Sequence, residues 1–540
     1  MSLFTAHIHP GQALGFLGNL LHNSLKERLR PLTELVLGAS LHDILTKLKA
    51  EPQRFPKLDL VYDPVSPVEE PVILNLPTNG VRLRFDGPEQ RLRLIEVLDF
   101  TKNHLTYNNK DVLRPGASTQ PDLAPAERFL GPTYRHIYKN LIGPTFPGEY
   151  IEPEAGNETG MGFYVLSYPG IAFSFPIPCS AWSAGKDVVS LLSSPTSQPA
   201  ASMAIFSGDS WPDARDRLYT QTLDPRQAFA VHTKNREPVA DEVRLVRIHG
   251  EGRLELLRPE GVAPFWITLG QTSPQELVAV IGPPDAIYRK NDQRMAIHKA
   301  RPGAGNHGRS DSSDRRLQDD STDTDQSSAH TATDDSDDGE EDGEVAGNVS
   351  SECFYNYFYH GFDILMSTPN TPSQIPPSKE PALQKSPSGG IIPADASIRL
   401  VASKLILHGN VPGSYPFNRH RRCRWEIAYL TPEKGHDIVN SETPFRDVEH
   451  RLHEEWKSIY KNADEARARQ RGMVLNRDWG DSPGSSVELL GGWEDSVGGR
   501  RTNSAGAEGG KGLGNTTLFG FPGLVFEVLN NGTVSGLTVF

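Results

Sequence analysis

The densest group of reactive side chains in the sequence is the run Arg419-His420-Arg421-Arg422, which lies close to Trp425. Arg419, Arg421 and Arg422 form a compact basic patch that could contact an anionic lipid headgroup or an acidic partner. The alternative is a solvated edge strand whose charges resist aggregation, and the sequence favours that interpretation. The run is therefore a candidate binding site and has no catalytic pattern of its own.

Other candidate motifs are incomplete. His450 and His453 have i, i+3 spacing, but a metal site needs further ligands and ordered support around them. The Gly-rich stretch 506–512 lacks the first glycine and the final Ser or Thr of a phosphate-binding loop. The sequence also contains no Gly-x-Ser-x-Gly nucleophile motif. We therefore predict no catalytic, metal-binding or cofactor-binding residues, and expect a protein that is not an enzyme.

Charge and cysteine content indicate in which cellular compartment the protein resides and which classes of partner it can bind. The net charge is −13, yet residues 301–350 alone hold 14 Asp and Glu against 4 Arg, so the rest is nearly neutral. No dominant basic field is present, which argues against nucleic-acid binding. Cys179, Cys353 and Cys423 are odd in number and far apart, so we predict buried free thiols in a reducing compartment. Without a signal-peptide pattern or an apolar run of membrane-spanning length, we expect a cytoplasmic protein.

Two further segments have alternative interpretations. The aromatic run 354–359 could be an exposed recognition stripe, but burial between a sheet and a helix is favoured. Residues 446–471 predict an amphipathic helix with Val448, Leu452, Trp456 and Ile459 on one face. This helix could dock on a partner or a membrane, but folding back on its own core is the favoured interpretation.

The elements that would position these residues recur along the chain. Ser273 begins a helix over 274–281, with Pro at the first position, Glu276 three residues after the cap, and Gly282-Pro283 as the stop. Similar capping patterns begin at Ser40 and Ser485, and a weaker helix signal ends at Gly143. We therefore predict four short helices of the same kind.

A glycine turn follows each predicted helix. Gly80, Gly170, Gly361 and Gly523 each precede a strand with alternating apolar residues, and a further strand can be placed after each. The pattern predicts a repeated unit of one helix and a three-stranded antiparallel meander. A single unit is small for its own core, so several should pack together. The predicted fold class is α+β, with these units in one scaffold interrupted by long disordered insertions.

The predicted division of the chain follows from these patterns. Residues 1–36 are an N-terminal segment in which 19–35 reads as an extra helix or, alternatively, a gene-model insertion. Composition predicts that 301–350, 367–396 and 494–516 are disordered. The remaining predicted parts are unit 1 at 37–107, unit 2 at 127–208, connecting strands at 209–263, unit 3 at 264–410, a connecting segment with the amphipathic helix at 411–479, and unit 4 at 480–540.

Blocks of motifs covering about half the chain resemble the PHAF (phagophore assembly factor) family, once called Lin-10 homologues. The resemblance rests on residues 72–76 and 92–97, 170–175, 205–208, 295–298, 354–358, 363–365, 412–415, 422–423, 526–528 and 534–540, in the family's order. The acidic, Pro-rich and Gly-rich insertions and residues 19–35 depart from it, which leaves any partner site in those segments in doubt.

The resemblance implies a non-enzymatic cytosolic adaptor that acts in autophagy. It also implies a β-propeller partner of the breast-carcinoma-amplified-sequence type at the phagophore assembly site, with membrane association through that partner. Older descriptions of the family place it near the Golgi and in protein traffic. The alternative function is a lipid- or apolar-ligand-binding protein of Golgi or endomembrane traffic, with a pocket near 354–359 and Arg419, Arg421 and Arg422 at the headgroup. The family supplies no catalytic residues.

Overall fold

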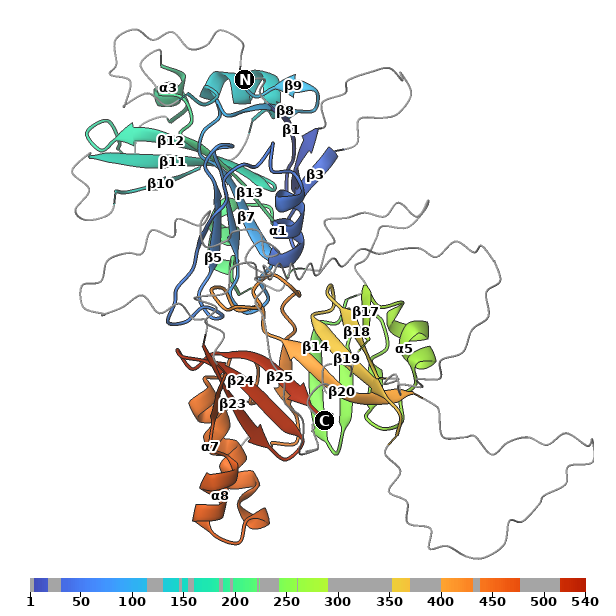
Figure 1. Ribbon diagram of the computed structural model, residues 1–540. Coiled ribbons are helices and arrows are strands. Elements are labelled where there is room, and N and C mark those ends of the chain that lie inside the picture. Colours follow the sequence, from blue (N-terminus) through green and yellow to red (C-terminus); the bar gives the residue numbers. More distant parts are fainter. Residues whose placement is uncertain are drawn as a thin grey trace, which may run out of the picture.

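The computed structural model describes residues 4–17, 31–113, 130–144, 148–153, 160–183, 188–194, 198–220, 223, 242–259, 261–289, 352–369, 400–430, 438–475 and 515–540. These residues form two lobes, the first from 4–223 and the second from 242–540 (Figure 1). The predicted disordered segment 301–350, nearly all of 367–396 and 494–516, and the predicted helix start at Ser485 lie outside the described residues. At the ends of two of these segments the prediction of disorder is wrong, because Ser367 ends one strand and Thr516 begins another.

The first lobe contains two sheets. One has the order β3-β2-β1-β8-β9 and the other the order β10-β11-β12-β13-β7-β6-β5-β4. The strands are β1 (Phe4–His9), β2 (Ala13–Leu17), β3 (Pro31–Val36), β4 (Asp59–Val61), β5 (Val72–Leu76), β6 (Val81–Phe85), β7 (Leu92–Val97), β8 (Asn103–Tyr107), β9 (Lys110–Asp111), β10 (Glu149–Ile151), β11 (Met161–Tyr168), β12 (Ile171–Pro178) and β13 (Ser202–Phe206). The helices are α1 (Leu41–Ala50), α2 (Tyr134–His136), the π-helix η2 (Ile137–Leu141), α3 (Val188–Ser193) and α4 (Trp211–Arg217).

The second lobe has a four-stranded sheet, β16-β15-β14-β21, and an eight-stranded sheet, β17-β18-β19-β20-β25-β24-β23-β22. The strands are β14 (Leu245–Gly250), β15 (Arg253–Leu257), β16 (Phe265–Thr268), β17 (Ala286–Arg289), β18 (Cys353–Tyr357), β19 (Phe362–Ser367), β20 (Val401–His408), β21 (Trp425–Ile427), β22 (Met473–Leu475), β23 (Thr516–Phe521), β24 (Leu524–Leu529) and β25 (Val534–Val539). The helices are α5 (Pro274–Ile281), α7 (Phe445–Glu455), the 3₁₀-helix η3 (Lys457–Ile459) and α8 (Ala463–Arg469).

The second lobe repeats the main topology of the first. Each lobe starts with a three-stranded meander whose first strand also pairs in parallel with a later strand, β8 in one lobe and β21 in the other. Two antiparallel meanders then join edge to edge, through β7 and β13 in the first lobe and through β20 and β25 in the second. A helix precedes each meander: α1, α2 with η2, α5 and α7. The two lobes thus share one topology, in which an opening meander is followed by two helix-meander units.

The turn glycines have the conformation that the sequence predicts. The φ angles of Gly80, Gly170, Gly361 and Gly523 lie between +60° and +83°, a region that residues with a Cβ rarely adopt. Each glycine carbonyl also accepts a hydrogen bond from a backbone N–H at the end of the last strand of its meander, either in its final residue or in the residue after it. The donors are Leu98, Phe206, His408 and Phe540, at 2.8, 3.2, 2.9 and 3.0 Å. The repeat is therefore confirmed at the level of individual hydrogen bonds.

Helix caps agree with the sequence in two units. The Ser40 hydroxyl accepts a hydrogen bond from the Asp43 N–H at 3.1 Å, and Ser273 with Glu276 forms a complete capping box at the start of α5. In the fourth unit, however, the helix before the meander is α7, within the predicted amphipathic segment. Its apolar side buries Phe445, Val448 and Leu452 in the core of the second lobe, as the favoured interpretation expected. The prediction of one helix over 446–471 is wrong in extent, because α7 ends at Glu455 and Ile459, in the 3₁₀-helix η3, is 55% exposed.

Some details differ from the sequence predictions. Each meander has a fourth, outer strand, because β4, β10, β17 and β22 extend the predicted three. Residues 31–36, partly assigned to an extra helix, form strand β3 instead, since pairing with β2 outweighs the helical leucine spacing. Cys353 and Cys423 are buried free thiols, but Cys179 is exposed.

Each lobe has its own hydrophobic core. In the first lobe, apolar residues of both sheets and of α1 pack together, and in the second lobe both sheets pack with α5 and α7. The α+β fold class is confirmed. Among the described residues, we find no helix long and apolar enough to cross a membrane.

Candidate functional site

The predicted basic run lies in the segment that connects β20 to β21, residues 409–424, here called the junction loop. It begins with Asn410 at a φ of +46° and turns at Gly413, whose φ is +81°. Arg419 is exposed, whereas His420, Arg421 and Arg422 are at most 7% exposed. The loop therefore directs neighbouring side chains into different environments instead of presenting one basic surface.

Arg421 belongs to a buried ionic group between the lobes. Its guanidinium pairs with Glu242 and donates to the Val243 carbonyl oxygen. The other oxygen of the Glu242 carboxylate lies 2.7 Å from Nη1 of Arg91, a residue of the first lobe. Complete burial, and then the nearby Arg91, lower the pKa of Arg421 to about 9. One carboxylate therefore holds an arginine of each lobe.

Arg422 makes the most extensive contacts in the junction. Its Nε donates to the carbonyl oxygen of Pro88 in the first lobe at 2.8 Å, and Nη1 donates to that of Gly409 at 2.7 Å. Nη2 donates to the Ser441 carbonyl oxygen at 3.3 Å and to the Glu442 carboxylate at 3.1 Å. All three nitrogens of the guanidinium are therefore satisfied by protein acceptors, and no part of this cation is available to an external anion.

Arg424 and Glu442 extend the network. Arg424 binds the Glu442 carboxylate through two hydrogen bonds of 3.0 and 3.1 Å, and its Nη1 lies 3.4 Å from Glu89 of the first lobe. Burial alone would raise the pKa of Glu442, but Arg422 and Arg424 hold it below its ordinary value. The carboxylate stays ionised because two guanidinium groups face it.

A neutral pair completes the junction. The Gln90 side-chain amide donates to the Asn410 carbonyl oxygen at 2.9 Å, and the Asn410 amide donates to Gln90 Oε1 at 2.8 Å. Both residues are buried and have positive φ angles. Val68 of the first lobe also packs with Val411 and Leu529 of the second. The junction is thus a polar interface with a small apolar contact.

The three arginines predicted to contact a headgroup therefore lie in different environments. Arg421 and Arg422 are buried with protein partners, and they lie in a loop rather than in an edge strand, so neither interpretation of the run describes them. Arg419 is exposed, and its guanidinium carbon lies 4.9 Å from the centre of the Tyr415 ring. Contact with an anion remains a prediction for Arg419.

Arg419 borders a cavity of about 550 Å³ in the second lobe. The walls come from β18, β19 and β20 on one side, β23, β24 and β25 on another, and the junction loop. The lining residues include Phe358, His408, Arg419, Leu518 and Glu527. This volume is in the range of small-molecule sites. The aromatic run borders it only in part, since Tyr357 is buried in the core and Tyr359 is exposed.

Asp363, His408 and His420 meet in the wall of this cavity, in an arrangement here called the His-Asp-His cluster. Nε2 of His408 lies 2.8 Å from one Asp363 oxygen, and Nε2 of His420 lies 2.9 Å from the other. The imidazole rings stack with centroids 3.7 Å apart. Burial lowers the pKa of His420 to about 4. Burial alone would raise the pKa of Asp363, but hydrogen bonds with both histidines hold it below its ordinary value.

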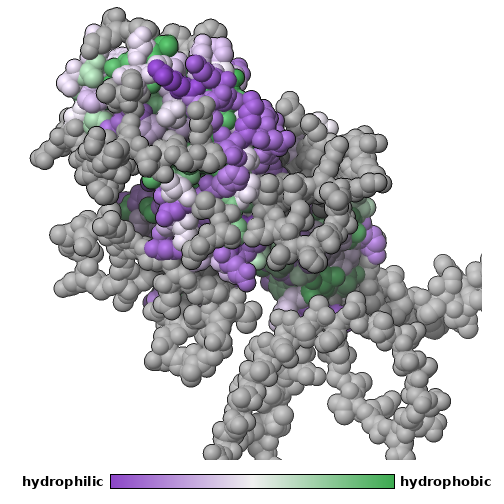
Figure 2. Space-filling view, turned by 90° about the horizontal axis from the view of Figure 1, so that it is seen from above, coloured by the Kyte–Doolittle hydropathy of each residue, from purple (hydrophilic) through white to green (hydrophobic). Residues whose placement is uncertain are grey.

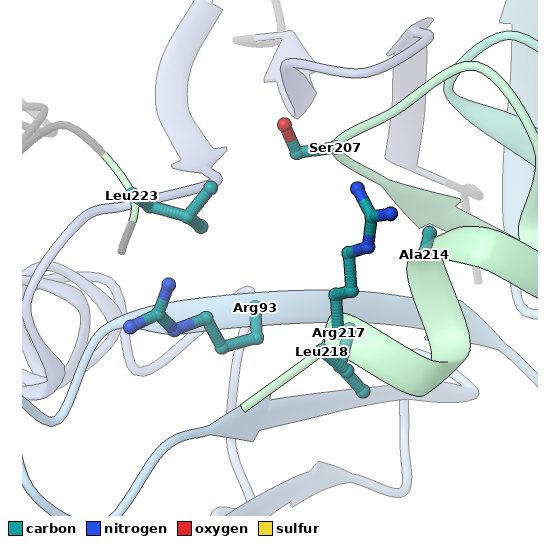
Figure 3. Close-up of a pocket in the computed structure, with 6 residues that line it drawn as sticks. All are labelled: Arg93, Ser207, Ala214, Arg217, Leu218 and Leu223. Atoms are coloured by element: carbon teal, nitrogen blue, oxygen red, sulfur yellow. The ribbon is translucent and has the colours of Figure 1, made fainter. Parts of the chain in front are cut away.

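A second pocket lies in the first lobe between β7 and α4. Figure 3 shows Arg93 on β7, and Ala214 and Arg217 from α4, with the Arg217 side chain directed toward Ser207. Its volume is about 10 Å³, which is the space of a single water molecule. It is therefore too small for an organic ligand.

Exposed large apolar residues occur in both lobes, and four of them lie in the two outer strands of one sheet of the second lobe. Figure 2 shows a band of hydrophilic residues across the molecule and a separate area where hydrophobic residues gather. In the outer strands β17 and β22, Ile287, Tyr288, Met473 and Val474 are 56%, 64%, 62% and 69% exposed. These four residues, here called the edge-strand residues, lie in the terminal strands of the described eight-stranded sheet.

The His450–His453 pair lies on the surface of the second lobe. Both side chains are on α7 and face glutamates of the same helix, Glu454 at 3.9 Å and Glu449 at 3.5 Å.

The His-Asp-His cluster was not found from the sequence. Its members are separated by 45 and 12 residues, so no local motif could have linked them.

Comparison with known proteins decides the family. The family model described as phagosome assembly factor 1 matches residues 32–314 and 392–540. The chain belongs to the phagosome assembly factor 1 family. This confirms the resemblance that the motif blocks indicated. The junction loop lies entirely within the second matched segment, as do His408 and His420.

Curated relatives carry the same family name. A PHAF1 protein of Drosophila melanogaster is 22% identical over 530 residues, which is 94% of this chain and 90% of the relative. One from Arabidopsis thaliana is 22% identical over 93% of this chain and 89% of its own length. One from Caenorhabditis elegans is 22% identical over 77% of this chain and 79% of its own length. No solved structure matches the chain significantly. Membership supports a role in phagosome assembly, consistent with autophagy.

Proposed function

We propose that this protein is a non-enzymatic adaptor that binds a β-propeller protein of the breast-carcinoma-amplified-sequence type and acts with it at the phagophore assembly site. Two findings support this: the family match over most of the chain, and the resemblance of its motif blocks to proteins with that partner. The protein would reside in the cytoplasm and reach the membrane through the propeller. A Golgi location is the older expectation for the family.

The observation that carries the proposal is the set of edge-strand residues. Terminal strands present backbone groups that can pair with a strand from another protein, and exposed apolar side chains next to them add affinity. The buried ionic network of the junction ties the two lobes together, as an adaptor requires if it is to present a fixed surface. β17 and β22 lie at opposite ends of the eight-stranded sheet, so we propose that one of these two edges makes the propeller contact.

A pull-down with substituted protein tests this placement. Tyr288→Asp and Val474→Asp each put a charge on an exposed side chain of one terminal strand. We expect the variant at the contacting edge to reduce recovery of the propeller protein by at least about tenfold, and the other variant to behave like wild type. Val65→Asp is the matched control, because Val65 is 75% exposed in the first lobe. Wild-type protein that captures no propeller-type protein, together with normal autophagic flux in a deletion strain, would refute the adaptor proposal. Equal recovery for all variants would move the contact elsewhere.

The cavity favours one second candidate, an apolar-ligand or lipid-binding protein of endomembrane traffic. The cavity has a suitable volume, includes Phe358 and Leu518, and has Arg419 at its border. Flotation with liposomes that contain anionic lipid separates the two functions. Isolated protein that floats, and that stays in the soluble fraction after Arg419→Glu, would support lipid binding. Isolated protein that stays in the soluble fraction and floats only with the propeller would support the adaptor.

A further inference from the structure

The His-Asp-His cluster assembles from three separate segments of the second lobe. Asp363 is on β19, His408 is the last residue of β20, and His420 is on the junction loop. One ligand atom from each side chain lies within 4.8 Å of the others. Asp363 and His420 are each 7% exposed, and the His408 side chain is 20% exposed. Two imidazoles and one carboxylate are thus concentrated in a small, largely buried volume.

The distances are close to those of a coordinated ion. Zinc ligands lie at about 2.0–2.1 Å in a tetrahedral arrangement, so two ligand atoms are about 3.3 Å apart. The Nε2–oxygen distances are 2.8 and 2.9 Å. The two Nε2 atoms face different Asp363 oxygens, so an ion held by both oxygens requires each Nε2–oxygen pair to separate by about 0.4–0.5 Å, from the same tetrahedral geometry. The imidazole rings stack at an interplanar angle of 14°, so one ring must also tilt for both Nε2 lone pairs to point at the ion. The cavity beside the cluster leaves room for this movement.

The surroundings resemble the support of a metal centre. The Asn356 amide donates to Asp363 Oδ1 at 2.9 Å, and this hydrogen bond orients the carboxylate from β18. Such supporting hydrogen bonds fix the orientation of ligating groups. The cluster also faces the cavity of about 550 Å³, where water or a ligand could occupy a fourth coordination position. Three protein ligands with one open position are typical of catalytic or exchangeable zinc sites.

We propose that Asp363, His408 and His420 bind one divalent transition-metal ion, and that Zn²⁺ fits best. Two imidazoles with one carboxylate suit zinc better than magnesium or calcium, which prefer oxygen ligands. The bound ion would attach the junction loop to β19 and β20, directly beside Arg421. This proposal is independent of the adaptor function, because none of its three residues belongs to β17 or β22.

Metal counting on the full chain tests the proposal. Protein is stripped of metal with a chelator and dialysed first against zinc sulfate and then against buffer. Bound zinc is then measured by inductively coupled plasma mass spectrometry. We expect one zinc per wild-type chain. His408→Gln should bind zinc at least about tenfold more weakly, because it removes one ligand. His408 is the most exposed ligand, so this substitution disturbs folding least. His450→Gln with His453→Gln is the control and should bind like wild type.

Cobalt spectroscopy on wild-type protein gives a second test that requires no variant. Co²⁺ at nitrogen and oxygen ligands gives visible d–d absorption without thiolate charge transfer, whereas binding through Cys179 would give charge-transfer bands. Circular dichroism confirms that each preparation is folded. Absence of zinc uptake by folded wild type, equal zinc affinity in folded His408→Gln, or thiolate bands would each overturn the proposal.

Discussion

Replacement of Arg422 by methionine tests whether the junction holds the two lobes together. The substitution keeps an unbranched side chain but removes the donors to three carbonyl oxygens, including that of Pro88 in the first lobe. Glu442 keeps its two hydrogen bonds from Arg424. The main loss is therefore three buried acceptors without donors and half of the positive charge that neutralises Glu442.

The size of the effect follows from these contacts. A buried polar group left without its partner costs about 1–3 kcal/mol, and removal of one member of a buried ion pair costs about 3–5 kcal/mol. The three carbonyl oxygens left without donors would alone cost about 3–9 kcal/mol, so we expect Arg422→Met to lower the free energy of unfolding by at least about 3–5 kcal/mol. In a lobe of this size, that loss lowers the melting temperature by about 6–20 °C.

The control is Arg419→Met, three residues earlier in the same loop. Arg419 is exposed and stacks on Tyr415, so its loss should cost about 0.5–1 kcal/mol. Urea unfolding and differential scanning calorimetry measure both variants. Small-angle scattering should show a larger radius for Arg422→Met at a temperature where both lobes stay folded. Equal unfolding midpoints for the two variants would refute the assignment of Arg422 to a buried network between the lobes.

Two further predictions concern backbone conformation and acid stability. A Cβ on Gly170 would lie 2.1 Å from the Gly11 nitrogen, whereas Gly261 has a similar φ of +86° and open space around it. Calorimetry should therefore show that Gly170→Ala lowers the free energy of unfolding by about 3 kcal/mol or more, and Gly261→Ala by about 1 kcal/mol. Equal losses would contradict the close approach of the β1–β2 turn to Gly170. Because the pKa of Glu442 is lowered in the folded protein, its stabilisation is present above pH 4.5 and is lost as the pH falls below that value through the folded pKa. Urea midpoints on both sides of pH 4.5 should therefore fall less steeply with acid for Glu442→Gln than for wild type, and parallel curves would contradict this assignment.

Local patterns predicted much of the repeat. Ser273 and Glu276 satisfy the free N–H groups of a helix start, and that requirement involves only four consecutive residues. Gly170 has a positive φ because the turn after Pro169 needs one, which is again a local property. The helix of the fourth unit was harder to identify. The capping pattern at Ser485 resembled the others, but the apolar side of α7 is what packs on the second core.

At the candidate site, local sequence patterns did not predict which side chains are buried. Four consecutive basic residues suggested one surface, because sequence cannot show which side chains meet a partner across the fold. Arg421 and Arg422 are buried since Glu242, Glu442 and the Pro88 carbonyl lie opposite them, and Pro88 is more than three hundred positions away. The cost of burying each charge is offset only by these distant acceptors.

The sequence by itself determined the helix caps, the turn glycines and the alternating strands, because these depend on hydrogen bonds and steric limits within a few residues. Only the tertiary structure decided that the units pair into two similar lobes, since edge-to-edge pairing of β7 with β13 and of β20 with β25 joins strands far apart in the chain. The same holds for Asp363, His408 and His420. Their side chains converge because three segments of one lobe meet beside a cavity. The spacing of these residues in the sequence does not predict this contact.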